Sequence, residues 1–151
     1  MAVEDLLAQQ RAEVLDEAFE GLSRSHPAHY ESSGEEFTRE RLAELFDIVV
    51  TALRDRQLEP VVRYVEAVAE QRFETGFGIA EVQTAFNVLE ETIWRRVVAA
   101  MRADELAEAL GLVGTVLGFA KDVLARRYVS LASQRHVPSL DLTTLFSGVE
   151  N

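Results

Sequence analysis

Two histidines lie close together in the sequence and could bind a metal ion. His26 and His29 are three residues apart and flank Pro27, and imidazoles at short spacing can share an ion such as zinc. Segment 25–34 interrupts the helical periodicity with serines, Pro27 and Gly34, so we expect a loop there. Neither a cysteine nor a well-placed third ligand accompanies the pair, and we therefore predict solvated histidines and no metal site.

Carboxylate pairs are the second arrangement that could carry chemistry, because such groups can serve as general acid and general base. Adjacent residues on a helix point in different directions, which favours solvated helix faces over catalytic pairs. No glutamate is followed three residues later by a histidine, the spacing that di-iron sites in helix bundles use. The acidic pairs concerned are Asp16-Glu17, Glu35-Glu36 and Glu90-Glu91.

The sequence lacks the motifs that bind nucleotides or build a serine nucleophile, namely G-x-x-x-x-G-K and G-x-S-x-G. Gly76-Phe77-Gly78 lacks the third glycine of a dinucleotide-binding loop and follows a predicted helix rather than a strand. The absence of cysteine excludes thiol catalysis, thiolate metal sites and disulfides. We therefore predict that the chain is not an enzyme and has no catalytic residue and no cofactor.

Three glycines form the feature that most suggests a binding surface. Gly111, Gly114 and Gly118 follow one another at spacings of three and four residues, on one face of a predicted helix. Each interior glycine costs up to ~1 kcal/mol relative to alanine, so the stripe indicates that another group approaches closely. Tight packing within the same bundle, a subunit interface and a ligand cavity all fit this pattern.

Two aromatic residues complete the set of candidate interface or pocket residues. Trp94 lies in the middle of a predicted helix beside two arginines, and its amphipathic ring suits either an interface anchor or the core. Phe86 lies two turns earlier on the same helix. We predict that Trp94, Phe86 and the three glycines contribute to an interface or a pocket.

The elements that must position these residues are helices, because apolar residues repeat at helical spacing along most of the chain. Ser33 and Glu36 form an S-x-x-E capping pattern, Thr38 and Asp104 are further candidate N-caps, and Pro60 suits a first helical turn. No segment alternates as a strand would. The predicted helices cover about residues 3–24, 35–53, 60–75, 79–102 and 104–134.

The predicted fold class is therefore all-α, with a single bundle of about five main helices. Residues 1–136 form the bundle, and residues 137–151 form a tail or linker in which one short helix is expected. A chain of 151 residues is long enough for one domain with its own core.

The overall charge limits the partners. Acidic residues outnumber basic ones by 26 to 15, giving a net charge of −11, and such a surface repels phosphate backbones and anionic lipids. No segment approaches the ~20 apolar residues that span a bilayer, and the N-terminus lacks the pattern of a signal peptide. We expect no nucleic acid or membrane partner and a cytoplasmic location.

The segment from Arg72 to Val82 resembles the N-terminal domain of RsbT co-antagonist proteins, the helical sensor portion of stressosome regulators. Its residues fit an Arg-x-x-x-Gly-x-x-Ile/Leu-x-Glu-Val pattern between two helices, and the helix order from about Glu36 to Leu131 also fits. The resemblance implies a globin-like, all-helical domain without haem, which forms a homodimer and regulates a partner protein.

The partners that the resemblance implies are STAS-domain proteins or a switch kinase, as in stress-response signal transduction. The family's phospho-accepting threonines lie in the linker or in a following STAS module. The sequence up to Asn151 contains no STAS module, so the resemblance assigns no role to Thr143 or Thr144. The alternative function is a helical bundle that binds a small ligand in an apolar pocket near the glycines, Phe86 and Trp94, without catalysis.

Overall fold

The computed structural model describes residues 1–136, and this part of the chain contains seven α-helices and no strand. The all-α bundle predicted from the sequence is confirmed, although its helices number seven rather than five. The helices are α1 (Val3–Gln9), α2 (Arg11–Arg24), α3 (Ala28–Ser33), α4 (Glu35–Asp55), α5 (Glu59–Glu74), α6 (Ile79–Ala100) and α7 (Ala103–His136). The short helix expected within residues 137–151 lies outside the described residues, as do Thr143 and Thr144.

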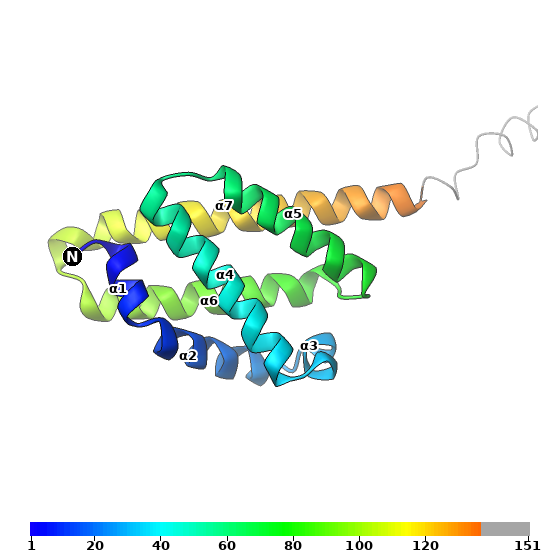
Figure 1. The fold of residues 1–151 in the computed structure, drawn as a ribbon, viewed down its shortest axis with the longest axis horizontal. Coiled ribbons are helices and arrows are strands. Elements are labelled where there is room, and N and C mark those ends of the chain that lie inside the picture. Colours follow the sequence, from blue (N-terminus) through cyan, green and yellow to red (C-terminus); the bar gives the residue numbers. More distant parts are fainter. Residues whose placement is uncertain (137–151) are drawn as a thin grey trace, which may run out of the picture.

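The two longest helices, α6 and α7, form an antiparallel hairpin with a tight turn at Met101 and Arg102. Helix α5 packs along α7, and α2 packs along α6. Helix α4 crosses the hairpin diagonally and contacts α2, α5, α6 and α7 (Figure 1). The hairpin is therefore the central element of the bundle, and the other helices cover only part of its surface.

The structure has two helices more than predicted, because apolar periodicity reveals neither a bend within a helix nor a short helix within a loop. The predicted helix over residues 3–24 bends at Gln10, where φ is −102° and ψ is 18°, and becomes α1 and α2. Leu7 and Val14 are fully buried on either side of the bend, so the apolar stripe continues through it. Within the predicted loop, residues 28–33 form α3, whose Tyr30 is only 4% exposed.

The predicted N-caps are wrong, whereas the predicted starting regions of the helices hold. Helix α4 begins after Gly34, whose φ of +98° suits glycine, and no side chain caps it. The hydroxyl of Ser33 instead donates backward to the carbonyl of His29 at 2.8 Å. Asp104 lies in the first turn of α7 rather than at its N-cap. Pro60 lies in the first turn of α5, as expected.

One hydrophobic core joins all seven helices. On α6, the apolar residues that repeat at helical spacing are at most 3% exposed, which confirms the apolar periodicity of that helix; they are Val82, Phe86, Leu89, Ile93 and Val97. Within residues 1–136, no helix is long and apolar enough to cross a bilayer.

Candidate functional site

The candidate interface lies on the outer surface of the α6–α7 hairpin. The three glycines of α7 are exposed, and an added Cβ on any of them would meet no atom of another helix of residues 1–136 within 4 Å. On α6, Trp94 is 50% exposed and Val98 is 41% exposed. We call these residues the α6–α7 face; they are Trp94, Val98, Gly111, Gly114 and Gly118.

Contacts along the hairpin show that Trp94 and Gly114 are neighbours. The ammonium of Lys121 donates to Oδ1 of Asn87 at 3.2 Å and to Oε2 of Glu90 at 2.5 Å. Gly114 lies seven residues before Lys121, and Trp94 lies seven residues after Asn87. Seven residues are about two helical turns, so in an antiparallel pair this register places Trp94 beside Gly114. The face is therefore one continuous surface.

Phe86 does not belong to this surface. Its side chain is 3% exposed and packs in the core, whereas that of Trp94 is 50% exposed. In the core, Phe86 lines a cavity of about 10 Å³. Small-molecule pockets usually measure about 300–1,000 Å³, so this cavity does not favour the alternative of an apolar ligand pocket shared by Phe86, Trp94 and the glycines.

Close packing between the helices of residues 1–136 is not the reason for the glycine stripe, because no other part of this described segment covers it. The close approach occurs at a different glycine. A Cβ on Gly21 of α2 would lie 2.9 Å from Cγ1 of Val88 on α6. The glycine that lets two helices of this bundle meet is therefore Gly21.

The segment from Arg72 to Val82 forms the turn between α5 and α6. Gly76 has a φ of +89°, a conformation that glycine adopts without strain, and it follows the end of α5. The amide of Phe77 donates to the carbonyl of Arg72 at 2.9 Å and closes the turn. Phe77 is 5% exposed, so the turn inserts an aromatic ring into the core.

Glu81 fixes the other side of this turn and joins it to α3. Its carboxylate accepts the amide of Gly78 at 3.3 Å and the amide of His29 at 2.8 Å, and its Oε2 lies 2.5 Å from Nδ1 of His29. Burial alone would raise the pKa of Glu81, but these donors outweigh it and lower the pKa below its usual value. Glu81 therefore remains ionised at neutral pH and anchors α3 to the start of α6.

His26 and His29 lie against different carboxylates. Nδ1 of His26 is 3.1 Å from Oε1 of Glu31, whereas His29 contacts Glu81. Across residues 1–136, no group of three or more histidine or acidic side chains is arranged to hold a metal ion. Each histidine thus lies within hydrogen-bond distance of its own carboxylate.

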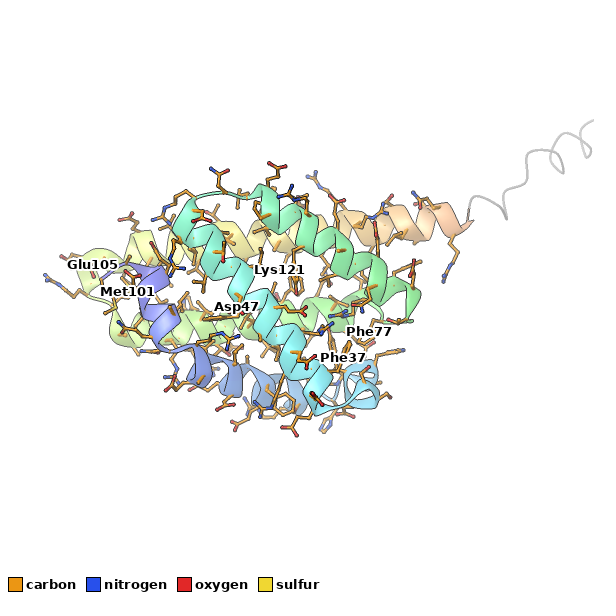
Figure 2. All side chains as sticks on the ribbon, in the orientation of Figure 1. Phe37, Asp47, Phe77, Met101, Glu105 and Lys121 are labelled. Atoms are coloured by element: carbon orange, nitrogen blue, oxygen red, sulfur yellow. The ribbon has the colours of Figure 1, made fainter. Side chains whose placement is uncertain are left out.

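Arg72 is buried beneath the same turn. It is 2% exposed, and its guanidinium carbon lies 5.2 Å from the ring centre of Phe37 and 5.6 Å from that of Phe77. Figure 2 shows Phe37 and Phe77 side by side at this end of the bundle. Nε of Arg72 donates to the Tyr30 hydroxyl at 3.5 Å, and Nη1 donates to the side chain of Gln71.

A known protein family matches the part of the chain that contains both this turn and helices α2 to α7. Residues 6–136 match the family described as the RsbT co-antagonist protein rsbRD N-terminal domain. The chain belongs to this family. The resemblance drawn from the sequence is confirmed, and membership implies a stressosome-type signalling domain. Comparisons with curated proteins and with solved structures found no match.

Two central residues of this rsbRD N-terminal domain were not predicted as site residues. Arg72 entered the sequence analysis only through the family pattern, and Tyr30 was placed in a loop. A signal for Arg72 was present, because it continues the buried stripe of α5 that runs through Val61, Val65 and Val68. The burial of Tyr30 depends on α3, which the sequence pattern did not indicate.

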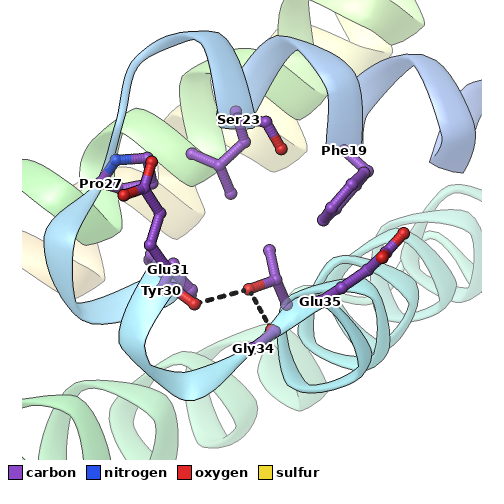
Figure 3. A pocket seen from close by; sticks show the side chains of 9 residues that line it. Phe19, Ser23, Pro27, Tyr30, Glu31, Gly34 and Glu35 are labelled. Atoms are coloured by element: carbon purple, nitrogen blue, oxygen red, sulfur yellow. Dashed lines mark hydrogen bonds between the residues drawn. The ribbon is translucent and has the colours of Figure 1, made fainter.

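A shallow hollow lies where α2, α3 and the start of α4 meet in this rsbRD N-terminal domain (Figure 3). Its volume is about 190 Å³, below the usual range for small-molecule pockets. Phe19 and Pro27 are among its lining residues. The hydroxyl of Thr38 lies within hydrogen-bond distance of the carbonyls of Gly34 and Tyr30, at 3.0 and 3.3 Å, which ties α3 to α4.

Proposed function

We propose that this domain is a non-catalytic regulator that acts as a homodimer through the α6–α7 face. The observation that carries the proposal is the exposure of three glycines beside a half-exposed tryptophan, on the longest helices of the described chain. Exposed helical glycines destabilise a monomer, by up to ~1 kcal/mol each relative to alanine. A partner backbone that packs closely on them would offset this cost.

A second copy of the chain is the occupant that fits this face best. Most soluble homo-oligomers are twofold symmetric, and a twofold interface brings the same patch of each copy together. The face contains a large side chain, Trp94, next to a flat strip at Gly114. A twofold axis close to these residues would seat each tryptophan on the glycine strip of the other copy. The face is therefore self-complementary in shape.

The dimer would pass its signal to another protein through α7. This helix carries the three glycines, contacts α4, α5 and α6 and continues to His136. A rigid helix transmits a change in dimer packing toward its far end. We expect the receiving partner to be a STAS-domain protein or a switch kinase in the cytoplasm, and no nucleic acid, because the net charge is −11.

Binding measurements with defined partners test this function. The full chain is immobilised, and purified STAS-domain proteins and switch kinases from the same cell are passed over it. Saturable binding of one of them at micromolar concentration is the expected result. If the Gly114→Leu variant retains its fold but binds that partner as the wild type does, the dimer is not part of the regulatory mechanism.

A further inference from the structure

We propose that the buried guanidinium of Arg72, together with Arg41, binds a chloride-sized inorganic anion. The two arginines line the same cavity, which lies between α4, α5 and α6. The ligand class follows from the charge, the burial and the volume of this cavity. The proposal does not depend on the homodimer.

The first argument is that Arg72 carries a buried charge without a counter-charge. The side chain is 2% exposed, and no carboxylate of residues 1–136 forms an ion pair with it. Its hydrogen-bond acceptors, the Tyr30 hydroxyl and the Gln71 amide, are both neutral. Aromatic rings attract a cation but do not neutralise it. An isolated charge in such a position is costly unless an anion pairs with it.

The second argument is that Arg41 adds an unused hydrogen-bond donor to the same place. Its guanidinium carbon lies 5.1 Å from the ring centre of Phe37, the ring that Arg72 also contacts. Nη2 of Arg41 forms ion pairs with Glu40 and Glu44, each at 3.2 Å. Its Nε is buried and has no hydrogen-bond acceptor in the described chain. An unused donor and an unpaired cation therefore line one cavity.

The third argument is the size of the cavity. Its volume is about 10 Å³, close to the space that one water molecule requires. A chloride ion is larger than a water molecule, but nitrate, sulfate, phosphate and carboxylates are larger still. Apolar side chains, including Leu42 and Phe86, form part of the lining and would make hydration of a bound ion incomplete. The site therefore favours a weakly hydrated, monatomic anion.

Occupancy of this site would strengthen the packing around the turn between α5 and α6. Arg41 lies on α4 and Arg72 lies near the end of α5, so an anion between them joins these two helices. Tyr30, which also lines the cavity, connects α3 to the same group. A change in chloride concentration would thus alter the stability of the segment that carries the family pattern.

Thermal unfolding of the full chain tests the proposal, with chloride replacing gluconate at constant ionic strength. Gluconate is too large for the cavity. The matched variants are Arg41→Gln and Arg63→Gln; Arg63 is also a helical arginine paired with a glutamate, but its side chain is 72% exposed. We expect chloride to raise the melting temperature of the wild type and of R63Q saturably, and R41Q to bind chloride about tenfold more weakly.

Crystals grown in bromide locate the anion directly. An anomalous peak between Arg41 and Arg72 is the expected result. The proposal is overturned if the site holds only an ordered water, if the melting temperature depends on ionic strength but not on the anion, or if R41Q responds to chloride as R63Q does.

Discussion

The Cγ1 methyl group of Val88 lies only 2.9 Å from the position that a Cβ atom would occupy on Gly21. At this contact α2 packs closely against α6, and no room is left for a side chain at Gly21. The glycines of α7 show the opposite relationship, because open space lies above each of them. The two kinds of glycine should therefore respond differently to the same substitution.

Replacing Gly21 with alanine should destabilise the domain by about 1 kcal/mol, since overpacking of ~1–3 kcal/mol exceeds the gain in helix propensity. Gly111→Ala, the matched control, should raise the free energy of unfolding of the monomer by about 0.5–1 kcal/mol. Urea denaturation followed by circular dichroism measures both. Equal effects of the two substitutions would show that the contact with Val88 is not tight.

Glu81 should stabilise the fold at neutral pH and lose this effect in acid. Glu81→Ala removes the acceptor for the amides of His29 and Gly78, at a cost of about 1–2 kcal/mol. The folded-state pKa of Glu81 lies below the ordinary value of 4.5, so its contribution is present above about pH 4.5 and disappears as the pH falls through the folded-state pKa. Denaturant titrations between pH 7 and pH 3 measure the difference from wild type.

The control for this prediction is Glu66→Ala, which removes an exposed carboxylate from the neighbouring helix α5. It should change the free energy of unfolding by less than about 0.5 kcal/mol. A difference between wild type and E81A that stays constant down to pH 3 would contradict the role of the ionised carboxylate.

Tyr128 should hold the turn between α5 and α6 against α7. Its hydroxyl donates to the carbonyl of Phe77 at 3.1 Å, and Tyr128→Phe should cost about 1 kcal/mol. Burial raises the pKa of Tyr128 from 10.0 to about 12, so the folded state retains the proton longer than the unfolded state does. The contribution of Tyr128 to stability is complete below about pH 10 and is lost as the pH rises toward 12. Titration of tyrosinate absorbance in wild type and Y128F measures the pKa of Tyr128.

The fold was predictable from the sequence where apolar periodicity determines the structure. The stripe of α6 and the start of α5 near Pro60 follow directly from the sequence. The bend at Gln10 and helix α3 were not predictable in this way. The bend leaves the apolar stripe intact, and α3 is stabilised by contacts distant in sequence, such as the one between His29 and Glu81.

The candidate interface stays a prediction, and the sequence indicates only part of its geometry. The glycine spacing places the three residues on one face of α7, but periodicity alone does not indicate whether a neighbouring helix covers that face. Phe86 and Trp94 illustrate the same limit, because both are aromatic residues on α6 and only the tertiary structure separates core from surface. The buried cation at Arg72 required knowledge of what surrounds it, since arginine is usually exposed.

Trp94 should report on association of the chain, because it is the only tryptophan in the sequence and is half-exposed in the monomer. Burial in a dimer interface should shift its fluorescence emission to shorter wavelength as the protein concentration rises. The Gly114→Leu variant should keep the emission of an exposed tryptophan at all concentrations. Emission that does not depend on concentration in either protein would place Trp94 outside any interface.

Sedimentation equilibrium of the full chain at micromolar concentration tests the homodimer on the α6–α7 face most directly, with wild type, Gly114→Leu and Gly21→Ala compared. We expect a dimer for the wild type and for G21A, and a folded monomer for G114L, because Gly114 lies on the proposed interface and Gly21 does not. A monomeric wild type, or a G114L variant that dimerises as tightly as the wild type, would contradict the account.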